Sequence, residues 1–279
     1  MVSPCREQLE ARLRKRLSSF LNRSSAWRPV IQVIENAAAR RAWRPFLFGG
    51  TLRDLCLSWS APPRDLDFVV PGASMEQLEE ELGQYIERRT RFGGLRLRIR
   101  SLPVDIWPLE QTWAFTAGLV ERPTPETLPR TTFLTVEAAA IELRPRPGRA
   151  REFHTNGLFE SFAASCLEIN LEENPYPALC VARSLLTARK LGFSLGPRLA
   201  AYLDHHGTQL GMEELEEAQV THYGDVLLSR EAMRGDLQAI RRQRAEERAP
   251  VRLPLATQGV LPCRMPLVTT SGKRTGRQS

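Results

Sequence analysis

Short apolar segments that end at turns constrain the fold of the first 110 residues most strongly. Residues 45–48 form one such segment, which stops at Gly49-Gly50 and leads into the start of a helix at about residues 51–58. Residues 66–70 form a second apolar strand, and residues 91–107 alternate between apolar and basic side chains, as two half-buried strands would. Strands interleaved with helices predict an α/β (α+β) domain built on a mixed sheet.

The rest of the chain is dominated by helical patterns. Before the first strand, apolar residues at helical spacing predict a basic amphipathic helix over 4–21 that packs on the domain, and a second helix over 29–42. Ser74 is expected to cap a helix that runs to about residue 88. Residues 133–143 fit either a strand or a helix. Further expectations are a loop over 121–130, helices from about 158 onward, with long stretches over 175–192 and 225–247, and a disordered tail over 249–279.

Composition excludes several classes of protein. Hydrophobic residues make up 42% and charged residues 25% of the 279 residues, which is typical of a globular protein. No apolar run approaches the ~20 residues of a membrane span, so no membrane partner is expected. The five cysteines are scattered and form no C-x-x-C pair, which argues against a disulfide framework or a zinc site and favours a reducing, cytoplasmic location.

The formal net charge of +7 is unevenly distributed. Residues 1–44 and 249–279 are strongly basic, whereas the region between them has more acidic than basic residues. Nearly all the basic residues are arginine, which fits either a compositional bias or the binding of phosphate groups. Attraction to a nucleic acid would therefore depend mainly on the two ends of the chain.

Two aspartates share one face of the strand at residues 66–70. Asp65 and Asp67 are two positions apart, so their side chains project together while Leu66 and Phe68 enter the core. Neighbouring carboxylates repel each other unless a cation lies between them, and hard oxygen ligands favour Mg²⁺ or Mn²⁺. Asp105 lies in a later strand and offers a third carboxylate. The alternative for all three is a solvated position at a strand end.

The turn at Gly49-Gly50-Thr51 follows a strand and opens a helix. Small residues there allow backbone N–H groups to approach a phosphate, and the helix dipole favours the anion. Arg53 lies one turn further on and could hold a phosphate oxygen. The alternatives are a plain strand-to-helix turn and an ion pair between Arg53 and Asp54.

An ordered series of motifs runs along the chain. The head motif is Phe48-Gly49-Gly50-Thr51-Leu52-Arg53-Asp54, followed by Arg64-Asp65-Leu66-Asp67. The later members of the series are Phe92-Gly93-Gly94, Val104-Asp105-Ile106, Thr132-Phe133-Leu134-Thr135-Val136-Glu137-Ala138, Ala182-Arg183 and Ala188-Arg189-Lys190-Leu191-Gly192-Phe193. This series resembles the polymerase-β-type nucleotidyltransferases, in the branch of the poly(A) polymerases and CCA-adding tRNA nucleotidyltransferases. The resemblance covers about residues 45–195.

The chain departs from this family at several positions. Thr131-Thr132 replace an Arg-Asp pair, and Glu137 replaces an asparagine. In the helix that resembles the family's neck, Cys180 replaces the first of two arginines and Arg183 remains. No Glu-Asp-x-x-Arg element is found, so base selection is expected to be altered.

The resemblance implies a nucleotidyltransferase head followed by a helical neck. It implies that Asp65, Asp67 and Asp105 are catalytic and bind two Mg²⁺ ions, and that Gly49, Gly50, Thr51, Arg53 and Arg183 bind the nucleotide. The implied reaction transfers a nucleoside monophosphate from an NTP, most simply ATP, to the 3′ end of an RNA such as tRNA. The expected organisation is a basic helix over 1–28, the head over 29–150, the neck over 151–248 and the tail over 249–279.

Two other functions remain open at this point. The same chemistry could modify a hydroxyl of a protein or a small molecule. Alternatively, the chain could be a non-catalytic RNA-binding relative, although the presence of Asp65, Asp67 and Asp105 favours catalysis. For residues outside these motifs the pattern predicts ordinary structural roles: His154, for example, is expected in a polar turn near Gly157. The sequence leaves the oligomeric state open.

Overall fold

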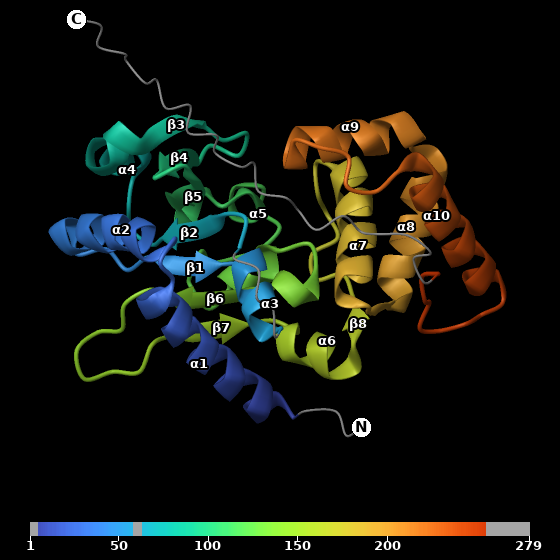
Figure 1. Cartoon of the computed structure of the whole chain (residues 1–279), viewed down its shortest axis with the longest axis horizontal. Coiled ribbons are helices and arrows are strands. Elements are labelled where there is room, and N and C mark those ends of the chain that lie inside the picture. Colours follow the sequence, from blue (N-terminus) through green and yellow to red (C-terminus); the bar gives the residue numbers. More distant parts are fainter. Residues whose placement is uncertain (1–4, 58–62, 255–279) are drawn as a thin grey trace, which may run out of the picture.

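A seven-stranded mixed sheet forms one half of the molecule, and a bundle of helices forms the other (Figure 1). The computed structural model describes residues 5–57 and 63–254. The strand order is β3-β4-β5-β2-β1-β6-β7. The strands are β1 (Phe46–Phe48), β2 (Leu66–Val70), β3 (Ile86–Arg89), β4 (Leu95–Ile99), β5 (Leu102–Pro108), β6 (Ala139–Glu142) and β7 (Phe153–Thr155). Within this sheet only β2 and β5 are parallel, so the α/β prediction with a mixed sheet is confirmed.

Helices surround the sheet and continue into the second half of the molecule (Figure 1). The helices that accompany the sheet are α1 (Arg6–Arg23), α2 (Arg28–Arg41), α3 (Gly50–Cys56), α4 (Met75–Leu82), α5 (Trp113–Thr116) and α6 (Leu158–Ala164). The second half contains α7 (Pro177–Leu191), α8 (Pro197–Gln209), α9 (Met212–Tyr223) and α10 (Arg230–Ala245). A short parallel pair, β8 (Cys166–Leu167) and β9 (Ser194–Leu195), links α6 to this bundle. No helix of the described residues is long and apolar enough to cross a membrane.

Helix α1 packs on the domain and anchors α3, the helix that follows the glycine turn. Leu9, Leu13, Leu17 and Leu21 of α1 are buried, which confirms the predicted amphipathic helix. Beside this apolar stripe, the Arg16 guanidinium donates hydrogen bonds to the carbonyl oxygens of Leu55, Cys56 and Leu57 at 3.3, 2.8 and 2.6 Å. These carbonyls lie at the C-terminal end of α3, where a helix has no internal donors left. Basic α1 therefore fixes α3 against the sheet.

The helix predicted from Ser74 is shorter than expected. Ser74 does form a capping box with Gln77, but α4 ends at Leu82 and a 3₁₀ turn over Gly83–Tyr85 follows. The next residues leave the helix because they form the edge strand β3, which pairs with β4. Cross-strand pairing outweighs the helical propensity of the local sequence here.

Two other segments are now defined. Residues 133–143, which fitted either a strand or a helix, form a 3₁₀ turn over Thr135–Glu137 and then strand β6. The helix expected over 225–247 begins only at Arg230, because the Ser229 side chain caps it by accepting a hydrogen bond from the amide of Ala232. The tail predicted over 249–279 lies outside the described residues from position 255 onward.

Candidate active site

The three predicted catalytic aspartates lie on neighbouring strands at the centre of the sheet. Asp67 on β2 is the register partner of Asp105 on the parallel strand β5. Asp65 comes two residues before Asp67, so its side chain falls on the same face of the strand. Neighbouring strands in a sheet are about 4.8 Å apart, which brings the three carboxylates to one region of the surface.

Arginines neutralise two of these three carboxylates. Arg64 donates to Asp65 at 2.8 Å, and its guanidinium also covers the ring of Tyr223 at 5.1 Å. Arg96 on β4 lies directly across from Asp105 and forms a bidentate ion pair with it. The hydrogen bond from Nη2 of Arg96 to Oδ2 of Asp105 is 2.6 Å long. The three carboxylates do not form a group whose ligand atoms all lie within 4.8 Å of one another; among the described residues only a different cluster does so.

Asp67 is the carboxylate without such a partner. Within the described part of the chain, no donor forms a hydrogen bond to its side chain. Burial raises the pKa of Asp67 well above its ordinary value, and the charges of Asp65 and Asp105 raise it further. Burial also raises the pKa of Asp105, against the opposing effect of Arg96. A buried carboxylate beside like charges is a favourable ligand for a cation, so Asp67 fits a role as ligand of a divalent metal ion.

The glycine turn lies against Asp67. Gly49 has φ +73° and ψ −132°, a backbone conformation that is essentially restricted to glycine. A Cβ atom at this position would lie 3.8 Å from Oδ2 of Asp67. Thr51 is buried, and its hydroxyl donates to the carbonyl oxygen of Asp65 at 3.1 Å, which ties the turn to the start of β2. The predicted phosphate turn and the predicted metal ligands are thus adjacent.

Arg53 and Arg183 meet at one buried carboxylate. Arg53 on α3 contacts Glu137 and also donates to Asp54 at 2.8 Å. Arg183 on α7 forms an ion pair with Glu137 at 2.7 Å. Burial alone would raise the pKa of Glu137, but Arg183 and Arg53 outweigh burial and lower it.

One ion pair joins α3 and α7 directly. Lys190, near the end of α7, lies 3.0 Å from Asp54 on α3. Helix α7 therefore contacts α3 directly through Lys190, and indirectly through Arg183, whose partner Glu137 also contacts Arg53. Its last turn also matches the predicted motif, since Gly192 adopts the left-handed conformation that ends α7.

Sequence reasoning named Asp54 as a partner of Arg53, and the structure contains that pair, but it missed the other partners of these site residues. The pairing of Arg96 with Asp105 could have been found, because alternation along β4 and β5 places both side chains on one face. The position of Glu137 could not be predicted in this way. Residues 133–143 fitted either a strand or a helix, and the two structures would point the Glu137 side chain in different directions. Tyr223 lies about 160 residues from Arg64 in the sequence, and only the packing of α9 brings the two together.

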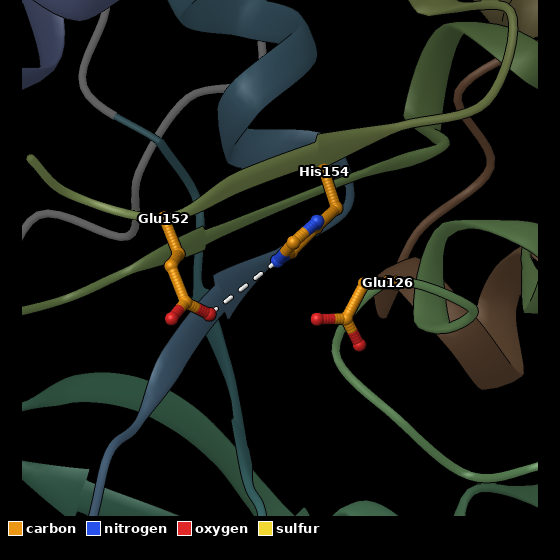
Figure 2. Close-up of side chains that lie close together, drawn as sticks. All are labelled: Glu126, Glu152 and His154. Atoms are coloured by element: carbon orange, nitrogen blue, oxygen red, sulfur yellow. Dashed lines mark ion pairs between the residues drawn. The ribbon is translucent and has the colours of Figure 1, made fainter.

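A separate cluster contains Glu126, Glu152 and His154 (Figure 2). His154 lies on strand β7 rather than in the expected polar turn. Its Nε2 is 3.6 Å from Glu152, and Glu126 faces both side chains from the loop before the 3₁₀ turn at Leu128–Thr131. Arg44 and Arg146 also pair with Glu152, at 2.6 and 2.9 Å. These arginines already balance the charge of Glu152.

Comparison with solved structures shows which fold this arrangement belongs to. The Thermotoga maritima CCA-adding enzyme complexed with tRNA matches 74% of this chain with a TM-score of 0.54 and 16% identity. A CCA-adding enzyme in complex with ATP matches 83% with a TM-score of 0.55 and 16% identity. The chain has the fold of the CCA-adding enzymes. A tRNA nucleotidyltransferase complexed with a primer tRNA and an ATP analogue also matches, over 76% of this chain, with a TM-score of 0.51 and 18% identity.

The likeness to CCA-adding enzymes is one of fold. The chain spans about half the length of these structures, covering 48%, 52% and 60% of them in the order given. No family model matches the sequence, and no curated protein matches it. The predicted mixed-sheet α/β domain with a following helical region is confirmed.

Proposed function

We propose that the chain is a metal-dependent nucleotidyltransferase that transfers a nucleoside monophosphate from an NTP to an acceptor hydroxyl. The observation that supports this most directly is the register of Asp67 with Asp105, beside a glycine turn that only glycine can form. The CCA-adding enzyme fold supports the same class of chemistry. In this proposal residues 29–150 form the catalytic head and residues 151–248 form the neck.

The roles of the side chains follow from their positions. Asp65, Asp67 and Asp105 would hold two divalent ions, Mg²⁺ or Mn²⁺. When bound, such ions lower the pKa of the attacking hydroxyl and stabilise the charge of the leaving group. The backbone amides of Gly49, Gly50 and Thr51 would bind the triphosphate at the start of α3. Arg53 and Arg183 would supply positive charge beside it.

The proposed reaction is an in-line displacement. The oxygen of the acceptor hydroxyl forms a bond to the α-phosphorus, the bond from that phosphorus to the bridging oxygen breaks, and pyrophosphate leaves. The hydroxyl proton passes to water. We propose ATP as the donor and the 3′ end of an RNA such as tRNA as the acceptor, because solved structures of this fold are complexes with tRNA and with ATP.

A transfer assay tests this proposal. The full chain is incubated with α-labelled ATP, Mg²⁺ and a tRNA transcript, and a transcript with a blocked 3′ end serves as the acceptor control. We expect label on the open transcript only. Asp105→Asn should abolish transfer, whereas Glu87→Gln should not, because Glu87 forms a similar cross-strand pair with Arg98 at an exposed edge. Label that enters protein instead of RNA would favour a protein acceptor, and no transfer to any acceptor would contradict the proposal.

A further inference from the structure

Glu137 holds a buried negative charge between the two arginines that face the candidate nucleotide site. Its side chain is 4% exposed. One carboxylate oxygen accepts from Arg53, and the other accepts from Arg183 at 2.7 Å. The two arginines come from α3 and α7, so Glu137 joins the helix that follows the glycine turn to the helical half of the molecule.

The charge of Glu137 changes the balance of this region. The contacts around it contain three cations, Arg53, Arg183 and Lys190, and two carboxylates, Asp54 and Glu137. Without Glu137, a second positive charge would be available to an incoming anion. A site for a triphosphate gains affinity from each free cation, so a carboxylate placed here opposes substrate binding.

We propose that Glu137 is a resident substitute for substrate phosphate: it holds Arg53 and Arg183 in place in the free protein and lowers the affinity of the site for a triphosphate. This inference rests on the proposed function, because it takes the glycine turn as the triphosphate site. Glu137 is thus a positioning residue, which acts through the two arginines.

The two arginines are not equally free to leave Glu137. The side chain of Arg53 is 11% exposed and is held by Asp54 as well as by Glu137. The side chain of Arg183 is 35% exposed, and its electrostatic effect reaches Asp67. Arg183 is therefore the side chain that exchanges Glu137 for phosphate, whereas Arg53 stays on its two carboxylates.

Direct binding of inorganic tripolyphosphate tests this exchange without requiring catalysis. Calorimetry compares the wild-type chain with Glu137→Gln, which keeps the shape of the side chain and removes its charge. We expect Glu137→Gln to bind tripolyphosphate at least about tenfold more tightly, since a freed charge-assisted contact contributes at least about that factor. The matched control is Glu142→Gln. Glu142 is also a buried carboxylate paired with an arginine, Arg44 at 2.8 Å, but it belongs to β6 and not to this network.

Thermal unfolding separates positioning from a purely structural role. Glu137→Gln leaves buried positive charge unbalanced, so its melting temperature should fall in buffer and recover at saturating tripolyphosphate. Glu142→Gln should lose stability without such recovery. Arg183→Gln provides a second variant at a more exposed position, and it should bind tripolyphosphate about tenfold more weakly than the wild type.

The outcomes distinguish this inference from the proposed function. Equal or weaker binding of tripolyphosphate by Glu137→Gln, or unchanged binding by Arg183→Gln, overturns the role of Glu137 even if nucleotide transfer is observed. Tighter binding by Glu137→Gln together with a complete absence of transfer supports the role of Glu137 and contradicts the proposed function.

Discussion

Asp67 on β2 lies directly beside Asp105 on the parallel strand β5, and only Asp105 is paired with an arginine. Burial and the charges of Asp65 and Asp105 raise the pKa of Asp67, so ionising its carboxylate costs free energy in the free protein. A residue that lowers stability in this way and faces a glycine turn is typical of a functional site rather than of a structural one.

Asp67→Asn should separate function from folding. Because the amide removes like-charge repulsion and keeps the shape of the side chain, we expect an unchanged or higher melting temperature at neutral pH. We also expect nucleotide transfer to fall below detection, because an amide is a poor ligand for a hard cation. Calorimetry and the transfer assay measure the two effects. An active Asp67→Asn variant would contradict the metal-binding assignment.

Gly49→Ala should damage the turn more than the same change at another left-handed glycine. With φ +73° and ψ −132°, Gly49 cannot accept a Cβ without strain, and the expected loss in the free energy of unfolding is about 1–3 kcal/mol. Triphosphate binding should weaken as well, because the backbone amides of the turn would shift. Urea unfolding and calorimetry with ATP measure these effects.

Gly192→Ala is the control for Gly49→Ala. Gly192 has φ +66° and ψ +26°, which other residues adopt at a cost of about 1–2 kcal/mol, and it lies at the end of α7. The Gly192→Ala variant should lose some stability and keep its affinity for ATP. If both variants bound ATP as the wild type does, the turn at Gly49 would not be a triphosphate site.

The sequence predicted those parts of the fold that depend on local patterns. Alternation along residues 95–99 placed Leu95, Leu97 and Ile99 in the core, and the Ser74 capping box was visible from residue types alone. The predicted end of α4 was wrong because it depends on strand pairing and not on the local sequence. Residues 86–89 form an edge strand only because β4 lies next to them. No local pattern carries that information.

The residues of the candidate site were named from the sequence, and their roles stay a prediction; their contacts were not predicted. Spacing along one strand and the motif series identified Asp65, Asp67, Asp105 and the glycine turn. The contact between Arg183 and Glu137 joins residues far apart in the sequence, and it depends on how α7 packs against the sheet half. Pairings of this kind follow from tertiary geometry, which a single sequence does not display.

The contact between Arg189 and Asp236 should stabilise the helical half. Asp236 on α10 is fully buried, and Arg189 on α7 donates two hydrogen bonds to it at 2.7 and 2.6 Å. Asp236→Ala leaves the arginine buried without a counter-ion, so we expect a loss of about 3–5 kcal/mol in the free energy of unfolding. Urea unfolding measures the loss.

A double variant checks whether the loss at Asp236 comes from the unpaired charge. Arg189→Met together with Asp236→Leu replaces the pair by apolar side chains, which should recover most of the stability. If the double variant were as unstable as Asp236→Ala, loss of packing rather than unbalanced charge would explain the effect.

Glu137 should give the protein an acid-sensitive component of stability. Although burial opposes ionisation, Arg183 and Arg53 lower the pKa of Glu137 below its ordinary value of 4.5. Above that value the carboxylate is ionised in both the folded and the unfolded chain, and the stabilisation by the arginines is complete. As the pH falls below it, the unfolded chain binds a proton first, so the free energy of unfolding decreases until the folded carboxylate is protonated too.

Urea unfolding of the wild type and of Glu137→Gln across this pH range tests the acid-sensitive component. The glutamine cannot titrate, so the difference in the free energy of unfolding between the two proteins should be largest at neutral pH and should shrink as the pH falls below about 4.5. A difference that stayed constant from neutral to acid pH would show that the two arginines do not stabilise the charge of Glu137. A difference that grew on acidification would mean that burial outweighs the arginines, and that the pKa of Glu137 is raised instead of lowered.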